Sequence, residues 1–333
     1  MKITKITTLL IALLFSTAAC TSGGLISTDI SDPTPPVEPP INQLAVLFSS
    51  NINTKAQDNS NFAIEEGDEF GKFMLYSGGT LQGEGNLGIH SVNKPNLKYT
   101  AKADGFLIPD GKTMLFPSDK TELVDFISYY PYNANAANID TKTFNIPVDI
   151  KDQNSKNIHI LFSDNAVDHS KNASTVVNLK YEYALSKIDI VTYIAEGSNL
   201  KDADLIGMTM AVTNIPTTAT FDLTNQTCSG HANILVHNET TNTGGLIANM
   251  AADGKSGSAI FIPMAAKADQ NMIFIFKLTN GNVFKYKVTN AQAFESSKKY
   301  KFSFGLQRNS LDVSTEIVDW VQGDTIDQEL DQD

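Results

Sequence analysis

Few residues of this chain have the types and spacing that catalysis or metal binding requires. Five histidines are scattered along 333 residues, and the closest two, His231 and His237, are six positions apart. On extended backbone this spacing places both only loosely on one face, so surface or loop positions are favoured over metal ligation. The sequence contains no G-x-S-x-G, H-E-x-x-H, C-x-x-C or calcium-binding D-x-D-x-D-G motif. We therefore expect a non-enzyme with no catalytic residues, no metal site and no cofactor.

The two cysteines stand in different surroundings. Cys20 follows the small residues Ala18 and Ala19, an order typical of the lipobox of bacterial lipoproteins. In that interpretation cleavage after Ala19 makes Cys20 a lipidated N-terminus that anchors the chain to the outer membrane. Simple secretion, with an incidental thiol at Cys20, is the alternative. Cys228 would then be the one remaining thiol, a bystander or a cross-link between copies, and no intramolecular disulfide could form.

The first 43 residues have the pattern of a targeting segment and a tether. Residues 1–19 combine basic Lys2 and Lys5 with an apolar run at Leu9–Phe15, which is typical of a signal peptide and shorter than the ~20 residues that span a bilayer. Residues 20–43 contain five prolines, and this composition predicts an extended, flexible tether. The net charge of −12 argues against nucleic acid as a partner.

The stretch Leu123–Tyr132 is the element around which we expect a core. Val124 and Phe126 alternate with Asp125 and Ile127, the period-2 pattern of a strand with one buried face. Pro131 cannot donate a backbone hydrogen bond and therefore marks the end of the strand or an edge position. The strand ends in a tyrosine cluster, composed of Tyr129, Tyr130 and Tyr132, that could pack in the core or offer aromatic faces to a carbohydrate. Alternation places Tyr130 with the core, so we favour packing.

Similar short segments recur along the chain and predict an all-β fold. Turn signals separate them at intervals near those of a β-sandwich, and Asn280-Gly281 is the strongest hairpin signal. Alternation stops in the polar segment Ser163–Ser174 and restarts at Val177. We therefore predict two tandem β-sandwich domains, residues 44–165 and 175–321, followed by an acidic tail over 322–333. The strand-like segments are Leu44–Phe48, Phe62–Tyr76, Leu97–Tyr99, Met114–Phe116, Phe144–Val148, Ile158–Phe162, Val177–Tyr183, Ile188–Val191, Thr209–Val212, Ala219–Leu223, Ala259–Ile262, Met272–Phe276, Tyr300–Leu306 and Val313–Trp320.

Three motifs give the chain a family resemblance. VDFISYYPY, the upstream GDEFGKFM and the downstream LSKIDI are similar, in order and in register, to the motif series of the Bacteroidales fimbrillins, which are lipoprotein-derived pilin subunits. The resemblance extends from about residue 53 to 320. It implies that each half is a transthyretin-like sandwich and that the chain is a subunit of cell-surface fimbriae. Its partners would be other fimbrial subunits, the outer membrane through the lipid anchor, and host or bacterial surface ligands.

The resemblance also implies a mode of assembly. In the family, a protease removes the N-terminal segment and exposes a groove, which a strand from the next subunit fills. Many members carry Arg before Ala at the cleavage point, whereas the matching place here is Lys55-Ala56, and Arg308 is the only arginine. The first strand, with Leu44, Val46 and Phe48, is therefore expected to stay attached unless a protease cuts after Lys55.

The other end of the chain bears on donation of a strand. The acidic tail is a poor donor for an apolar groove, so a donor strand with Val313, Thr315 and Ile317 is the alternative. We lean toward an accessory or anchor-like subunit that keeps its lipid, with a stalk pilin as the close alternative. A function of a different class is a surface glycan-binding lipoprotein of a nutrient-uptake system.

Overall fold

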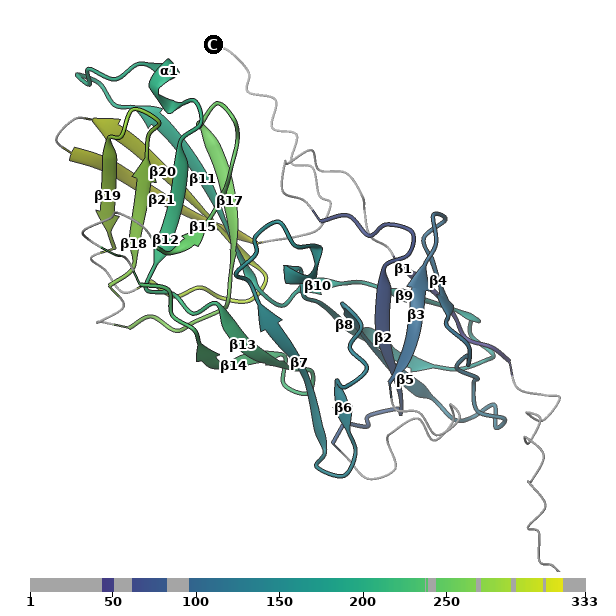
Figure 1. Ribbon diagram of the computed structural model, residues 1–333. Coiled ribbons are helices and arrows are strands. Elements are labelled where there is room, and N and C mark those ends of the chain that lie inside the picture. Colours follow the sequence, from purple (N-terminus) through teal and green to yellow (C-terminus); the bar gives the residue numbers. More distant parts are fainter. Residues whose placement is uncertain are drawn as a thin grey trace, which may run out of the picture. The chain divides into compact units, whose positions relative to one another are not determined.

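Short β-strands make up almost all of the regular structure (Figure 1). The computed structural model describes residues 44–50, 62–82, 96–236, 238, 244–267, 271–288, 292–307 and 310–319, and in these ranges the only helices are η1 (Lys156–Ile158) and α1 (Asp202–Leu205). The all-β class predicted from the sequence is thus confirmed. The strands are β1 Leu47–Ser50, β2 Glu69–Tyr76, β3 Leu97–Ala101, β4 Phe106–Pro109, β5 Val124–Tyr130, β6 Ala137–Asn138, β7 Thr143–Asp149, β8 Leu161–His169, β9 Val176–Leu179, β10 Glu182–Tyr183, β11 Ser186–Ile194, β12 Thr209–Thr213, β13 Thr218–Asp222, β14 Thr227–Ala232, β15 Leu246–Ile247, β16 Asn249–Met250, β17 Ser256–Phe261, β18 Ile273–Lys277, β19 Val283–Lys287, β20 Lys298–Gln307 and β21 Ser310–Asp319.

The largest sheet contains the strand that the sequence marks as central. Its order is β10-β8-β5-β2-β3-β4-β1-β9, so β5 lies between β8 and β2. Tyr129 of β5 pairs with Gly71 of β2, and a Cβ at Gly71 would stand only 2.0 Å from the tyrosine ring. Because Gly71 has no side chain, the Tyr129 ring lies across it and stacks on Phe73 at 6.0 Å between centroids. Tyr129 and Tyr130 are therefore both buried, although strict alternation places them on opposite faces.

The second half of the chain forms two further sheets. One has the order β16-β17-β11-β20-β21, with β11 and β20 parallel over eight residue pairs, and the other has the order β15-β12-β18-β19. The apolar segment that the sequence marks as a central strand is β18, which has β12 and β19 on its two sides. Asn280 and Gly281 lie in the turn between β18 and β19, and Gly281 has φ of +90°, so the predicted hairpin is present.

A fourth sheet draws its strands from both halves of the chain. Its order is β14-β13-β7-β6, and β13 pairs with β7 in antiparallel register from Thr218 opposite Asp149 to Asp222 opposite Asn145. Figure 1 shows the teal β7 beside the green β13. Backbone hydrogen bonds thus join segments that the sequence analysis placed in separate domains.

The polar segment Ser163–Ser174, in which we predicted the domain boundary, is strand in its first part. β8 continues through it to His169, and the following β9 and β10 pair with β1 and β8 of the first half. The change to the sheets of the second half therefore falls between Tyr183 and Ser186. The pattern is misleading here because the pairing of β5 with β8 has two register shifts, which interrupt the alternation of buried and exposed residues. Whether the two halves fold separately, and whether each is a transthyretin-like sandwich, stays a prediction.

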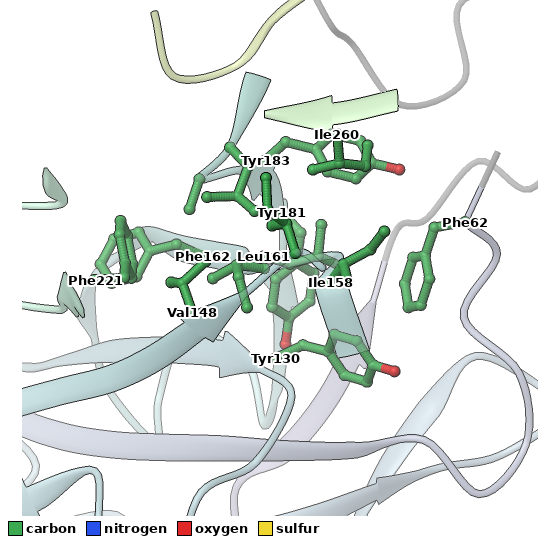
Figure 2. Packing of buried hydrophobic residues seen from close by; sticks show 14 of the residues in the cluster. Phe62, Tyr130, Val148, Ile158, Leu161, Phe162, Tyr181, Tyr183, Phe221 and Ile260 are labelled. Carbon is green, nitrogen blue, oxygen red and sulfur yellow. The ribbon is translucent and has the colours of Figure 1, made fainter. Parts of the chain in front are cut away.

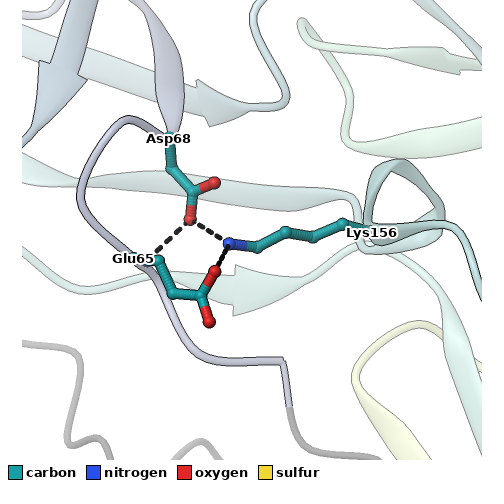
Figure 3. Close-up of polar contacts among 3 residues, drawn as sticks. All are labelled: Glu65, Asp68 and Lys156. Carbon is teal, nitrogen blue, oxygen red and sulfur yellow. Dashed lines mark hydrogen bonds and ion pairs between the residues drawn. The ribbon is translucent and has the colours of Figure 1, made fainter.

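The hydrophobic core is continuous across the fourth sheet. Figure 2 shows Val148 and Phe162 of the first half beside Phe221 of the second, and the rings of Phe162 and Phe221 are 6.1 Å apart. Near Ile158, also labelled there, the chain turns from β7 into η1. Lys156 of η1 forms ion pairs with Asp68 at 2.7 Å and Glu65 at 3.0 Å, as Figure 3 shows, and so fastens η1 to the loop before β2.

Candidate functional site: the groove filled by the first strand

The N-terminal strand occupies a slot between two strands that come much later in the sequence. β1 pairs in antiparallel fashion with β4, where Phe48 is opposite Leu107, and in parallel fashion with β9, where Leu47 is opposite Val176. Residues 44–46 extend this contact, since the Val46 amide donates to the carbonyl of Met114 and the Leu44 carbonyl accepts from the amide of Phe116, both at 2.9 Å. Backbone hydrogen bonds therefore hold the strand on both sides.

From Val46 to Phe48 the side chains alternate between the core and solvent. Val46 and Phe48 are 2% and 0% exposed, whereas Leu47 between them is 49% exposed. Leu44, which the sequence pattern places on the same face as Val46 and Phe48, is 44% exposed. Burial of a side chain such as that of Phe48 stabilises a fold by roughly 1.5–3 kcal/mol. The ring of Phe48 meets Tyr99 and Phe126 edge to face, with centroids 5.2 and 5.1 Å apart. Val46 and Phe48 are thus the residues with which the N-terminal segment 44–50 fills the groove.

The floor of the groove carries a buried amine. Lys72 of β2 is 0% exposed, and its Nζ lies 4.4 Å from the centre of the Phe48 ring. Nζ donates to the hydroxyl of Ser128 at 2.9 Å and to that of Tyr181 at 3.5 Å, and the two hydroxyl groups are 2.6 Å apart. Burial lowers the pKa of Lys72 well below its ordinary value, because the protein interior solvates the ammonium less well than water does.

Sequence reasoning gave this lysine no role, although the signal was present. Phe70, Lys72 and Met74 share one face of the strand pattern, and the two flanking residues are apolar. A lone lysine on an otherwise apolar face indicates either that the segment is not a strand or that the amine is buried. The hydroxyl partners come from Ser128 and Tyr181, far away in sequence, and spacing alone does not bring them to Lys72.

The structure covers only some of the other site residues predicted from the sequence. Cys20, Ala19, Lys55 and Ala56 lie outside the described residues, so lipidation and cleavage stay predictions. The donor segment lies in β21, which pairs with β20 along all ten of its residues. Within it the side chains of Thr315 and Ile317 are exposed, and the described side chains do not include that of Val313.

Chemistry outside the groove is sparse in the described part of the chain. No group of three or more His, Cys, Asp or Glu residues there could hold a metal ion. Cys228 is partly buried, and burial raises its pKa to about 12, so its thiol stays protonated at neutral pH. His231 is exposed and bonds through Nε2 to the carbonyl of Pro263, while His237 lies outside the described ranges. None of the described helices is long and apolar enough to cross a membrane.

The chain belongs to the fimbrillin-like family, whose model matches residues 54–320. This finding confirms the resemblance seen in the sequence motifs. Over 293 residues the chain is 30% identical to a protein of Bacteroides uniformis proposed to be the fimbrium subunit Fim1C, with 86% of this chain and 88% of the relative covered.

Solved structures share the fold. A protein of Bacteroides uniformis, proposed to be a cell adhesion protein, is similar with a TM-score of 0.63 and 24% identity, over 85% of this chain and all of that one. A fimbrial protein of Bacteroides vulgatus matches with a TM-score of 0.52 and 13% identity, over 84% of this chain and 100% of the other. At these identities the likeness concerns the fold alone.

Proposed function

We propose that this chain is a structural, non-catalytic subunit of cell-surface fimbriae whose first domain is completed by its own N-terminal strand. Membership of the fimbrillin-like family supports the fimbrial role. The observation that carries the proposal is the placement of β1 between β4 and β9, with Phe48 fully buried. A groove that one short terminal strand fills by main-chain pairing can equally accept a strand from another subunit.

Exchange of this strand would be governed by competition between the two donors. An attached β1 is present at high effective concentration, so a strand from another molecule displaces it only if the connection is cut or the incoming strand binds much better. The cleavage point of the family is replaced here by Lys55-Ala56. We therefore assign the chain an accessory or anchor-like place in the fimbria, in which β1 is retained.

Two further steps belong to the same proposal. Cys20 carries lipid and holds the subunit at the outer membrane, which metabolic labelling with a fatty-acid analogue tests in the wild type and in Cys20→Ala. The donor strand offered to a neighbour lies within residues 310–319, where β21 forms a sheet edge. To donate it, the subunit must pair the free side of β21 or release it from β20.

A matched pair of variants on β1 tests the role of the groove in cells. Phe48→Ser removes the buried ring, and Leu47→Ser changes the exposed neighbour by the same substitution type. We expect immunogold microscopy to find the wild type and Leu47→Ser on fimbriae, and Phe48→Ser to be strongly depleted there. Absence of the wild-type protein from any fibre, together with specific binding on a glycan array, would instead favour the surface glycan-binding lipoprotein.

A further inference from the structure

The amine of Lys72, which lies under β1, is enclosed in a cage of aromatic rings and hydroxyl groups. Three aromatic rings surround Nζ of Lys72, with centroids at 4.4 Å for Phe48, 5.4 Å for Tyr99 and 5.9 Å for Phe70. The hydroxyl groups of Ser128 and Tyr181 complete the surroundings. Among the described residues no carboxylate forms an ion pair with Lys72. The interactions that offset burial of the amine therefore come from π-faces and hydroxyl groups.

Only one of the side chains around Nζ of Lys72 belongs to β1. Phe70, Tyr99, Ser128 and Tyr181 all come from the body of the domain, on β2, β3, β5 and the segment between β9 and β10. Phe48 comes from β1 and is the nearest ring. A strand with an aliphatic residue at that place would leave the amine without its closest π-face. A basic residue there would bury a second ionisable group beside Lys72.

We propose that Lys72 is a specificity-determining residue of the groove and selects a strand that places an aromatic ring over its amine. This inference rests on the proposed function, because it supposes that the groove which β1 fills can also accept a strand from another subunit. The partner it fits is a β-strand with an apolar residue followed two positions later by an aromatic residue, as in Val46 and Phe48.

The rule discriminates between segments of the chain itself. Val313, Thr315 and Ile317, the donor face expected from the sequence, contain no aromatic residue. The opposite parity of the same region has Val318 and, two positions later, Trp320, the only tryptophan in the chain. A second copy that donates this region is therefore expected to use the register that brings Trp320 over Lys72.

Peptide binding to the full chain tests the rule. Two recipients are used: the Phe48→Ser variant, whose own strand competes weakly for the groove, and the same variant with Lys72→Met added. The probes are a synthetic peptide of residues 44–50 and its Phe48→Leu form. With Lys72 we expect the phenylalanine peptide to bind at least fivefold more tightly. In Lys72→Met the preference should fall below about twofold, since the methionine has no donor for a π-face. An equal preference in both recipients would overturn the proposal.

A double-mutant cycle in the intact chain tests the role of Lys72 without any added peptide. Phe48→Leu and Lys72→Met are made singly and together, and the urea midpoint of unfolding is measured for each. We expect Phe48→Leu to shift the midpoint less in Lys72→Met than in the wild type, whereas Leu47→Ala should shift it equally in both. Additive shifts for Phe48 would contradict the role of Lys72. Failure of both peptides to bind would show that the groove does not accept another strand and would count against the proposed function, while this cycle still decides the role of the lysine.

Discussion

A buried lysine without a carboxylate partner is costly at the scale of one residue. The interior lowers the pKa of Lys72, so the unfolded chain binds more protons between that lowered pKa and the ordinary value of about 10.4. Stability should therefore rise with pH across this window. A contribution to stability therefore does not account for this lysine, whereas the proposed role in selecting the strand above it does.

The first prediction is that Lys72→Met stabilises the protein at neutral pH. Ser128 and Tyr181 keep their mutual hydrogen bond at 2.6 Å, so the change leaves both hydroxyl groups paired. We expect a gain of roughly 1–3 kcal/mol by urea unfolding at pH 7, and a loss of the rise with pH. Lys98→Met, in which a half-buried lysine loses ion pairs to Glu69 and Asp110, is the control and should not stabilise. A destabilised Lys72→Met would contradict the account.

The second prediction concerns acid and His159. Burial, then the positive charges of Lys187 and Lys156, lower the pKa of His159 to about 4. Its Nδ1 is buried without a hydrogen-bond partner in the described structure, and its ring stacks on Phe62 at 4.9 Å. Because the unfolded value is about 6.5, the unfolded state binds more protons between pH 6.5 and about 4, and stability falls as the pH drops through that window.

Thermal unfolding at pH 7, 5.5 and 4.5 measures this effect. We expect His159→Leu to lose part of the wild-type decline in midpoint, whereas His231→Gln, at an exposed position, should keep it. Identical declines in the wild type and His159→Leu would show that other groups set the acid sensitivity.

At the scale of elements, one glutamine side chain joins the two halves. Gln153 precedes η1 and is 7% exposed. Its Oε1 accepts from the amide of Ile260 at 2.7 Å, and its Nε2 donates to the carbonyls of Ile260 at 3.2 Å and Ile150 at 2.7 Å. It thus pairs with the backbone of β17 as another strand would, and satisfies groups that β16 is too short to reach.

The third prediction is that Gln153→Ala costs about 2–3 kcal/mol of unfolding free energy. The change leaves the buried amide and carbonyl of Ile260 without these partners, and an unpaired buried group costs about 1–3 kcal/mol. Asn154→Ala, at the exposed neighbour, is the matched control and should change stability little. Both free energies of unfolding are measured in urea, and equal losses in Gln153→Ala and Asn154→Ala would contradict the prediction.

Sequence patterns predicted the elements better than their partners. Alternation identified β5, and the Asn-Gly turn identified the β18–β19 hairpin, because both signals are local. Pairing is not local: β1 lies beside β9, with Leu47 opposite Val176, and β7 lies beside β13. A period of two residues says which face is buried but not which strand is adjacent. The groove could therefore be anticipated from the family resemblance, whereas its amine required the fold.

At the scale of the whole molecule, the two halves share a sheet. β13 pairs with β7, and β9 and β10 pair with strands that precede the exposed turn near Asn172. A cut in this turn would leave strands on both sides of it still paired. The fourth prediction is that limited proteolysis within residues 171–174 gives two fragments that co-elute in native size-exclusion chromatography and separate only in denaturant. Fragments that separate without denaturant, each still folded, would instead establish two independent domains.

The central claim is that this fimbrillin-like chain enters fimbriae with its first strand still in place. The most direct test is mass-spectrometric mapping of the N-terminus of the subunit in purified fimbriae. We expect an acylated Cys20 at the N-terminus and peptides that contain Leu44–Phe48 in stoichiometric amount. A mature N-terminus at Ala56, with residues 44–48 missing, would contradict the claim and indicate a subunit whose groove is opened for another strand.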